Sequence, residues 1–72
     1  MEYTHRIGER VRLISEDYTE YGVVAWSYLN EQGDEDCYVT FFGTVKPDED
    51  KKPQETPYVL RFYASSLTKG WQ

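Results

Sequence analysis

The 72-residue sequence contains a single cysteine, Cys37, so the chain cannot form an internal disulfide. Small secreted domains are usually stabilised by several disulfides, and their absence predicts a reduced, cytoplasmic protein. No apolar run approaches the roughly 20 residues that a membrane-spanning helix needs. The polar N-terminus, residues 1–6, is not followed by the apolar segment of a signal peptide. We therefore expect neither membrane insertion nor secretion.

Basic residues are also scarce. The chain has eight Lys and Arg residues against thirteen Asp and Glu residues, which gives a net charge of −5. Proteins that bind nucleic acid are usually basic, so this small acidic chain is not expected to have nucleic acid as its partner. A domain of this size buries only about 60% of the surface that its unfolded chain exposes. It has room for one core, but a deep enclosed active site is not expected.

Helical spacing of apolar residues is absent, and apolar residues instead alternate with polar ones in the two-residue period of half-buried strands. The aromatic content of 17% also favours strands. Strands are predicted at residues 7–14, 21–28, 37–42 and 58–63, followed by a 3-10 turn at 64–67 and a short fifth strand at 69–71. The predicted fold class is an all-β barrel of about five short antiparallel strands, whose closure would protect the sheet edges.

The domain organisation follows from the same pattern. Residues 1–6 are predicted to form an N-terminal tail and residues 7–72 the barrel. The stretch 43–57 holds all three prolines and a mixed run of charges, which predicts a long mobile loop.

The predicted core follows from the alternation within the strands. Alternation predicts that Val11, Leu13, Val39, Phe41 and Leu60 are buried, and the core is completed by Val24, Phe62 and Leu67.

Two segments carry a resemblance to known families. Residues 8–14 (GERVRLI), followed after a loop by residues 21–24 (YGVV), resemble a KOW-type motif. Residues 38–41 (YVTF) and 60–67 (LRFYASSL) look like the later strands of Tudor and other SH3-like barrels. The resemblance implies an SH3-like fold. The same spacing is similar, more weakly, to photosystem I reaction-centre subunit IV, whose Asn-rich segment is missing here. KOW domains carry basic residues around the loop, where this chain has Glu16, Asp17 and Glu20.

Residues that could support catalysis or metal binding are few. His5 and Cys37 are the only nucleophile and base of the classical kind, but His5 belongs to the predicted frayed tail and Cys37 to a strand face shared with Val39 and Phe41. The acidic runs 34–36 and 48–50 have adjacent rather than spaced carboxylates, unlike a calcium loop. Zinc sites need several Cys and His ligands. We therefore predict no catalytic residue, no cofactor and no metal, and the protein is not expected to be an enzyme.

Aromatic residues exceed what the core requires. Six of them are predicted to form an exposed binding patch: Tyr21, Trp26, Tyr28, Tyr38, Phe42 and Tyr63. Nearby acidic residues are predicted to form its rim: Glu31, Asp34, Glu35 and Asp36. Tyr and Trp are enriched at protein interfaces. The alternative is that these aromatics are only cross-strand packing pairs of a small sheet.

The leading hypothesis is a non-enzymatic adaptor or regulatory module that binds a larger protein through these aromatics and acidic loops. Two other functions stay open. One is a KOW-like nucleic-acid contact through Arg10 and Arg12, which project from the same face of the first predicted strand. The other is an acidic decoy that occupies the nucleic-acid site of a basic partner, with carboxylates in place of phosphates.

Overall fold

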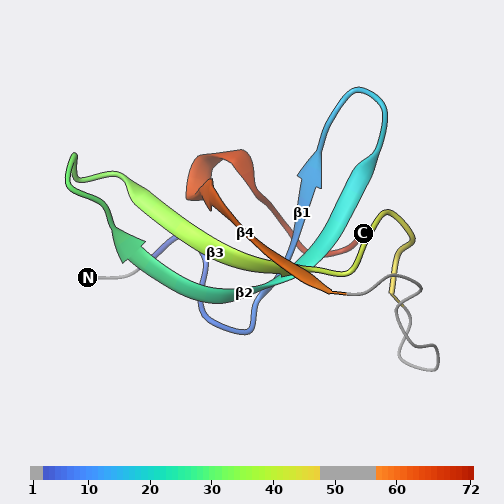
Figure 1. The fold of residues 1–72 in the computed structure, drawn as a ribbon, viewed down its shortest axis with the longest axis horizontal. Coiled ribbons are helices and arrows are strands. Elements are labelled where there is room, and N and C mark those ends of the chain that lie inside the picture. Colours follow the sequence, from blue (N-terminus) through green and yellow to red (C-terminus); the bar gives the residue numbers. More distant parts are fainter. Residues whose placement is uncertain (1–2, 48–56) are drawn as a thin grey trace.

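The computed structural model describes residues 3–47 and 57–72, which form an all-β fold (Figure 1). Its elements are β1 (Arg10–Ile14), β2 (Thr19–Leu29), β3 (Glu35–Phe41), β4 (Tyr58–Tyr63), the 3-10 helix η1 (Ala64–Ser66) and β5 (Thr68–Lys69). The prediction of five antiparallel strands with a 3-10 turn before the last one is confirmed. Most of the predicted mobile loop, residues 48–56, lies outside the described residues. No helix in the described ranges is long and apolar enough to cross a membrane.

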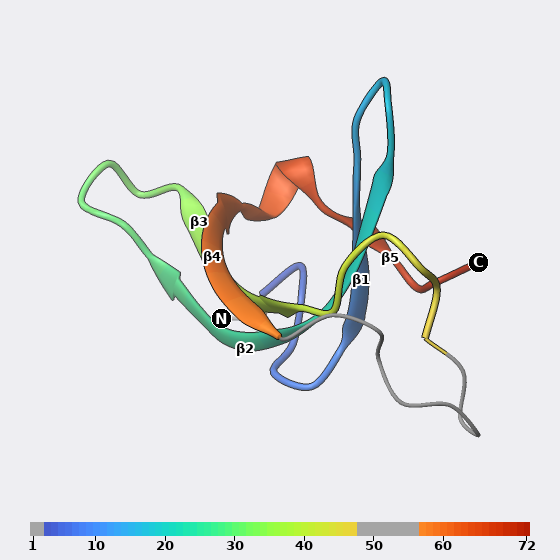
Figure 2. The same cartoon turned by 45° about the vertical axis from the view of Figure 1, so that its right-hand side comes forward.

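The strands form one antiparallel sheet in the order β4-β3-β2-β1-β5. The first half of the long strand β2 pairs with β1, and its second half pairs with β3. Figure 2 shows that the sheet is strongly curled, with η1 between β4 and β1. Among the described residues, the edge strands β4 and β5 do not pair with each other. The sheet therefore curls without complete closure, and β4 keeps an edge that closure was expected to protect.

The core lies on the concave side of the sheet. Its buried apolar residues come from β1, β2, β3 and the segment after β4: Val11, Val24, Cys37, Val39, Phe41, Ala64 and Leu67. Phe41 is central, because its ring stacks on Tyr58 and meets Phe62 edge-on, with both centroid distances 5.7 Å. The predicted burial of Val11, Val39 and Phe41 is confirmed. Leu13 and Phe62 are half-buried and pack against this core.

The prediction that Leu60 is buried is wrong. Leu60 pairs with Val39 and therefore faces the same side of the sheet, yet it is 43% exposed. Among the strands that the structure describes, β4 stands at the edge of the sheet, and none beyond it covers the side chain. Alternation along a strand identifies the face of a residue but does not report the position of that strand within the sheet.

The segment before β1 is not a frayed tail at His5, contrary to the sequence-based expectation. His5 is 1% exposed. The hydroxyl of Ser27 donates to its backbone carbonyl over 2.8 Å, and its imidazole contacts Glu9 and the carbonyl oxygen of Ala64. Polar groups become buried only when hydrogen bonds replace their contacts with water. The segment therefore packs between the sheet and η1 as part of the fold.

Gly22 lies where β1, β2 and β3 overlap, and it pairs with both Val11 and Phe41. A Cβ atom at this position would lie 2.7 Å from the carbonyl oxygen of Thr40 and 2.7 Å from a methyl carbon of Val39. The backbone of Gly22 is not in the positive-φ region. Glycine is therefore required here for space, because a side chain would collide with the neighbouring strand.

Candidate interaction surface

A β-bulge between Val24 and Trp26 decides which way the aromatic side chains of β2 point. Val24 pairs with the buried Val39, whereas Trp26 pairs with Tyr38 and Ala25 has no partner in the register. Uninterrupted alternation would place Trp26 on the inward face with Val24. The extra residue reverses the alternation and re-aims the following side chains, which is a common effect of bulges. Trp26 consequently lies on the outer face, opposite the core.

Aromatic side chains from three strands gather on this outer face. Trp26, Tyr38 and Arg61 form one cross-strand row, and Tyr28 and Tyr63 belong to the next row. The rings of Tyr28 and Tyr38 stack with a centroid distance of 5.8 Å. The exposed fractions of Trp26, Tyr38 and Tyr63 are 57%, 40% and 53%. We call these five residues the aromatic face.

A buried carboxylate lies within the aromatic face. Asp36 stands between Tyr28 and Tyr63 in their cross-strand row and is buried, and the side-chain amide of Asn30 donates to it over 3.3 Å. A side-chain hydrogen bond with Tyr28 raises the pKa of Arg61, and the negative charge of Asp36 adds to this effect. The charge of Asp36 therefore favours the charged form of Arg61. Asp36 was predicted to belong to an acidic rim, but it is buried between two residues of the aromatic face.

The turn between β2 and β3 presents the other acidic residues. The side-chain oxygen of Asn30 accepts the backbone N–H groups of Gln32 and Asp34 over 3.0 and 2.9 Å. Gly33 has a φ of 84°, a backbone conformation that is unfavourable for residues with a Cβ atom. Asn and Gly therefore build this turn, and it leaves Glu31 and Asp34 exposed.

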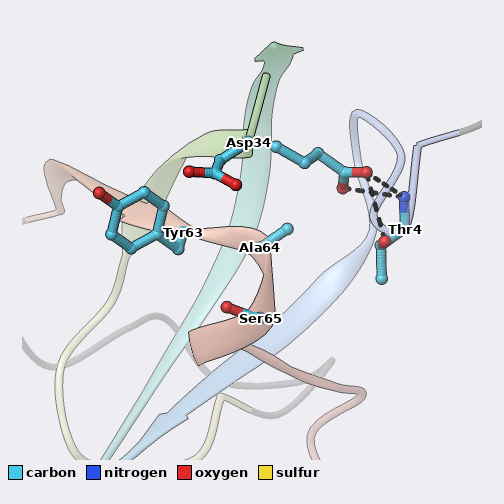
Figure 3. A pocket seen from close by; sticks show the side chains of 6 residues that line it. Thr4, Asp34, Tyr63, Ala64 and Ser65 are labelled. Carbon is cyan, nitrogen blue, oxygen red and sulfur yellow. Dashed lines mark hydrogen bonds between the residues drawn. The ribbon is translucent and has the colours of Figure 1, made fainter. Parts of the chain in front are cut away.

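Glu35 has a different role from its predicted place in the rim. Both of its carboxylate oxygens accept the backbone N–H of Thr4, over 2.9 and 2.8 Å, so Glu35 holds the N-terminal segment. A hollow of about 510 Å³ lies beside this contact and is lined by Thr4, Asp34, Glu35, Tyr63, Ala64 and Ser65. Figure 3 shows the Asp34 carboxylate beside the Tyr63 ring in this hollow. A second hollow of about 400 Å³ lies between the β2–β3 turn and Arg61.

Two of the six predicted patch residues lie elsewhere. Tyr21 pairs with Arg12, in the half of β2 that contacts β1. Phe42 meets Trp71 edge-on at a centroid distance of 6.4 Å, and the guanidinium of Arg10 stacks over the same Trp71 ring at 4.6 Å. These contacts form a second cluster around the C-terminal tryptophan. The structure thus brings together Trp26, Tyr28, Tyr38 and Tyr63 but not Tyr21 or Phe42.

His5 and Cys37 do not form a nucleophile–base pair. The imidazole Nδ1 lies 3.0 Å from a Glu9 carboxylate oxygen, and Nε2 lies 3.0 Å from the carbonyl oxygen of Ala64. The thiol of Cys37 contacts the hydroxyl of Ser27 at 3.6 Å instead. Burial raises the pKa of the Cys37 thiol, and this favours the unreactive protonated form. Both residues therefore act as packing and hydrogen-bonding groups of the core.

Metal ligands are not assembled in the described ranges. No three His, Cys, Asp or Glu side chains within residues 3–47 and 57–72 are grouped so that they could hold a metal ion. In the run 34–36, Asp34 is exposed, Glu35 binds Thr4 and Asp36 is buried, so the three carboxylates point to different places. The second acidic run, residues 48–50, lies outside the described residues.

Comparisons with protein-family models, with curated proteins and with solved structures found no match for this chain. The resemblance to KOW and Tudor domains, and to SH3-like barrels in general, therefore stays a prediction from the sequence.

Sequence reasoning missed two members of this surface. Arg61 shares the outward face of Tyr63 by simple alternation, but only the strand register places it opposite Tyr38. Asn30 organises the turn and contacts Asp36, and the spacing of Asn30 and Gly33 was the available signal. The turn is rich in acidic residues, but its geometry depends on the uncharged amide of Asn30.

Proposed function

We propose that the protein is a non-enzymatic interaction module that binds a larger protein through the aromatic face, without a cofactor. The observation that carries the proposal is that Trp26, Tyr38 and Tyr63, from three different strands, are all exposed on one face. Aromatic residues and Arg are enriched in the residues that dominate binding energy at interfaces. Arg61 in the same face adds the second residue type that such sites favour.

Cross-strand packing accounts for part of this surface but not for all of it. Tyr28 and Tyr38 stack on each other, as packing pairs do. Trp26 and Tyr63 are each more than half exposed, and no other ring stacks on them within the described ranges. Rings that stay exposed contribute little to folding, since burial is what makes them stabilising. Their exposure supports a role in binding.

The polar groups support a binding function rather than chemistry. Cys37 is buried with a raised thiol pKa, and the imidazole of His5 is held by Glu9 and Ala64. A lone reduced cysteine suits the cytoplasm, which is where we place the protein.

The arginine side chains do not gather into one basic surface. Arg61 lies three strands away from β1, and Arg10 is stacked on Trp71. This separation of Arg61 from the arginines of β1 favours a protein partner over the KOW-like nucleic-acid contact.

Capture of partners from a host extract, followed by mass spectrometry, tests the proposal. The bait is the full chain, compared with Trp26→Ala and with Tyr18→Ala as the matched control. Tyr18 is also about half exposed, but it lies in the loop between β1 and β2. A specific partner should bind the wild type and Tyr18→Ala equally and bind Trp26→Ala more than tenfold more weakly.

Two other outcomes of the capture experiment would contradict this proposal. Equal binding to all three proteins would place the interface outside the aromatic face. Partners that are all basic nucleic-acid-binding proteins, displaced by added nucleic acid, would instead support the acidic decoy.

A further inference from the structure

From Val59 to Tyr63, the strand β4 has one edge that no other strand of the described residues pairs with. Within residues 3–47 and 57–72, β4 pairs with β3 alone and stands at the end of the sheet. Alternate residues of an antiparallel strand direct their backbone N–H and C=O groups to opposite edges. About half of the backbone groups from Val59 to Tyr63 therefore face away from β3. An edge of this kind is a template for pairing with another chain.

The side chains of β4 give this edge little of the usual protection of an edge strand. Its register with β3 is continuous from Tyr58 to Tyr63, without proline, glycine or a bulge, and its only charge is Arg61. Val59 is exposed on the outer face and Leu60 on the concave face. A strand lying beside β4 would cover both side chains, because its own alternate residues point to the two faces.

Arg61 is the one charge on β4 itself, but the charges that gather at the Tyr63 end of this edge favour a basic occupant. Glu31 and Asp34 are exposed at the turn beside Tyr63, and the lining of the larger hollow holds Asp34 and Glu35 without any basic side chain (Figure 3). A second copy of the chain, with its own net charge of −5, would bring negative charge to a negative surface. A lysine or arginine from a partner would instead meet the Asp34 carboxylate and the face of the Tyr63 ring.

We propose that an extended, basic segment of a partner protein adds to the sheet as a strand along β4. An apolar side chain of this segment covers Leu60, and a basic side chain enters the hollow beside Asp34 and Tyr63. Backbone pairing supplies affinity in this mode of recognition, while alternate side chains supply specificity. The inference rests on the proposed function, because β4 also contributes Arg61 and Tyr63 to the aromatic face.

A short end-blocked peptide of alternating valine and lysine is the probe for strand addition. Its binding should slow amide hydrogen exchange between Val59 and Tyr63, since outward N–H groups become paired. Two further peptides carry N-methyl groups on alternate amides, in complementary sets. One set should weaken binding more than tenfold and the other should not, because only every second amide faces β4. Equal affinities of the two methylated peptides, or unchanged exchange in β4 at millimolar peptide, would overturn the proposal.

Protein variants separate this inference from the proposed function. Leu60→Lys places a positive charge on the concave side of the edge, and Ile14→Lys makes the same change of charge at an exposed residue of β1. Leu60→Lys should lose peptide binding and Ile14→Lys should keep it. Partner capture that needs Trp26 but survives Leu60→Lys would refute strand addition and leave the aromatic face as the interface. Sedimentation of the wild type without peptide as a dimer that Leu60→Lys dissociates would show that a second copy is the occupant, against the proposal.

Discussion

The imidazole Nε2 of His5 lies 3.0 Å from the carbonyl oxygen of Ala64, and this contact joins the N-terminal segment to η1 across 59 residues of sequence. The other ring nitrogen faces the Glu9 carboxylate at 3.0 Å. The imidazole is therefore held between a side chain of the segment before β1 and the backbone of η1.

The first prediction concerns Glu9. Its partial burial alone would raise the carboxyl pKa, but the hydrogen bond from His5 and the charge of Lys69 outweigh this effect and lower the pKa below its ordinary value of 4.5. A lowered native-state pKa contributes stability above the unfolded value, and that stability is lost as the pH falls through the native value. Glu9→Gln should therefore cost on the order of 1 kcal/mol near neutral pH, and the difference should shrink as the pH falls below about 4.5.

Urea unfolding at a series of pH values measures this difference. Lys69→Gln is the control, because Lys69 contacts the same carboxylate at 3.4 Å but is mostly exposed. Exposed ion pairs contribute about 0–1 kcal/mol, so its effect should be the smaller one. A constant difference between wild type and Glu9→Gln at all pH values would refute the role of the charge.

The second prediction contrasts Phe41 with Leu60, two residues of the predicted core. Phe41 is fully buried and contacts Tyr58 and Phe62, so Phe41→Ala should cost about 3–5 kcal/mol. That loss is enough to unfold a small domain with a thin stability margin. Leu60→Ala should cost much less, because Leu60 is already exposed. Thermal melting of both variants checks this, and equal losses would contradict the edge position of β4.

Strand positions and faces could be predicted from the sequence because alternation is a local property of the chain. The buried row of Cys37, Val39 and Phe41 agrees with that pattern. The exposure of Leu60 could not be predicted, since it depends on which strand forms the edge of the sheet. The burial of His5 depends on a contact with Ala64 at the opposite end of the sequence. Local patterns contain no information about such distant partners.

The outward position of Trp26 illustrates the same limit within the candidate site. The sequence indicated an aromatic patch from the number of aromatic residues and not from their facing, because strict alternation from Val24 would turn Trp26 inward. The bulge at Ala25 turns Trp26 to the outer face instead. The position of this bulge is set by the register between β2 and β3. Gly22, three residues earlier in β2, is required instead for the close approach of β3.

The third prediction concerns that close approach. Gly22→Ala places a Cβ atom 2.7 Å from the Thr40 carbonyl oxygen, so the strands must separate, and we expect a loss of about 1–3 kcal/mol. Gly33→Ala is the comparison, because its Cβ would meet no atom within 4 Å and its cost comes only from a positive φ. That strain costs about 1–2 kcal/mol. Amide exchange distinguishes the two variants: Gly22→Ala should speed exchange in β3, and Gly33→Ala should affect only the turn. Unchanged exchange in β3 of Gly22→Ala would contradict the steric argument.

The fourth prediction is that the protein has no measurable affinity for double-stranded DNA or RNA at physiological salt. Its net charge is −5, and the loop after β1 carries Glu16 and Asp17. Affinity without sequence specificity comes from neutralised phosphates, with a salt slope of about −0.9 per contact on DNA. Arg10 is stacked on Trp71, which leaves few free cations on β1. Micromolar binding that weakens steeply with salt, and that Arg10→Glu with Arg12→Glu abolishes, would establish the nucleic-acid function instead.

The last prediction tests the aromatic face through Tyr38. Its side chain pairs with Trp26, stacks on Tyr28 and is 40% exposed, so its removal opens no cavity in the core. A stacked aromatic pair is worth about 0.5–1.5 kcal/mol beyond its buried area, and Tyr38→Ala should lower stability by no more than this order. Partner capture should fall more than tenfold, which corresponds to about 1.4 kcal/mol or more. Thermal melting and capture are measured on the same preparation, with Tyr18→Ala as the control. If Tyr38→Ala unfolds the protein, Tyr38 contributes to the stability of the core despite its exposure. If it changes neither measurement, the stacked pair is surface packing and the partner binds elsewhere.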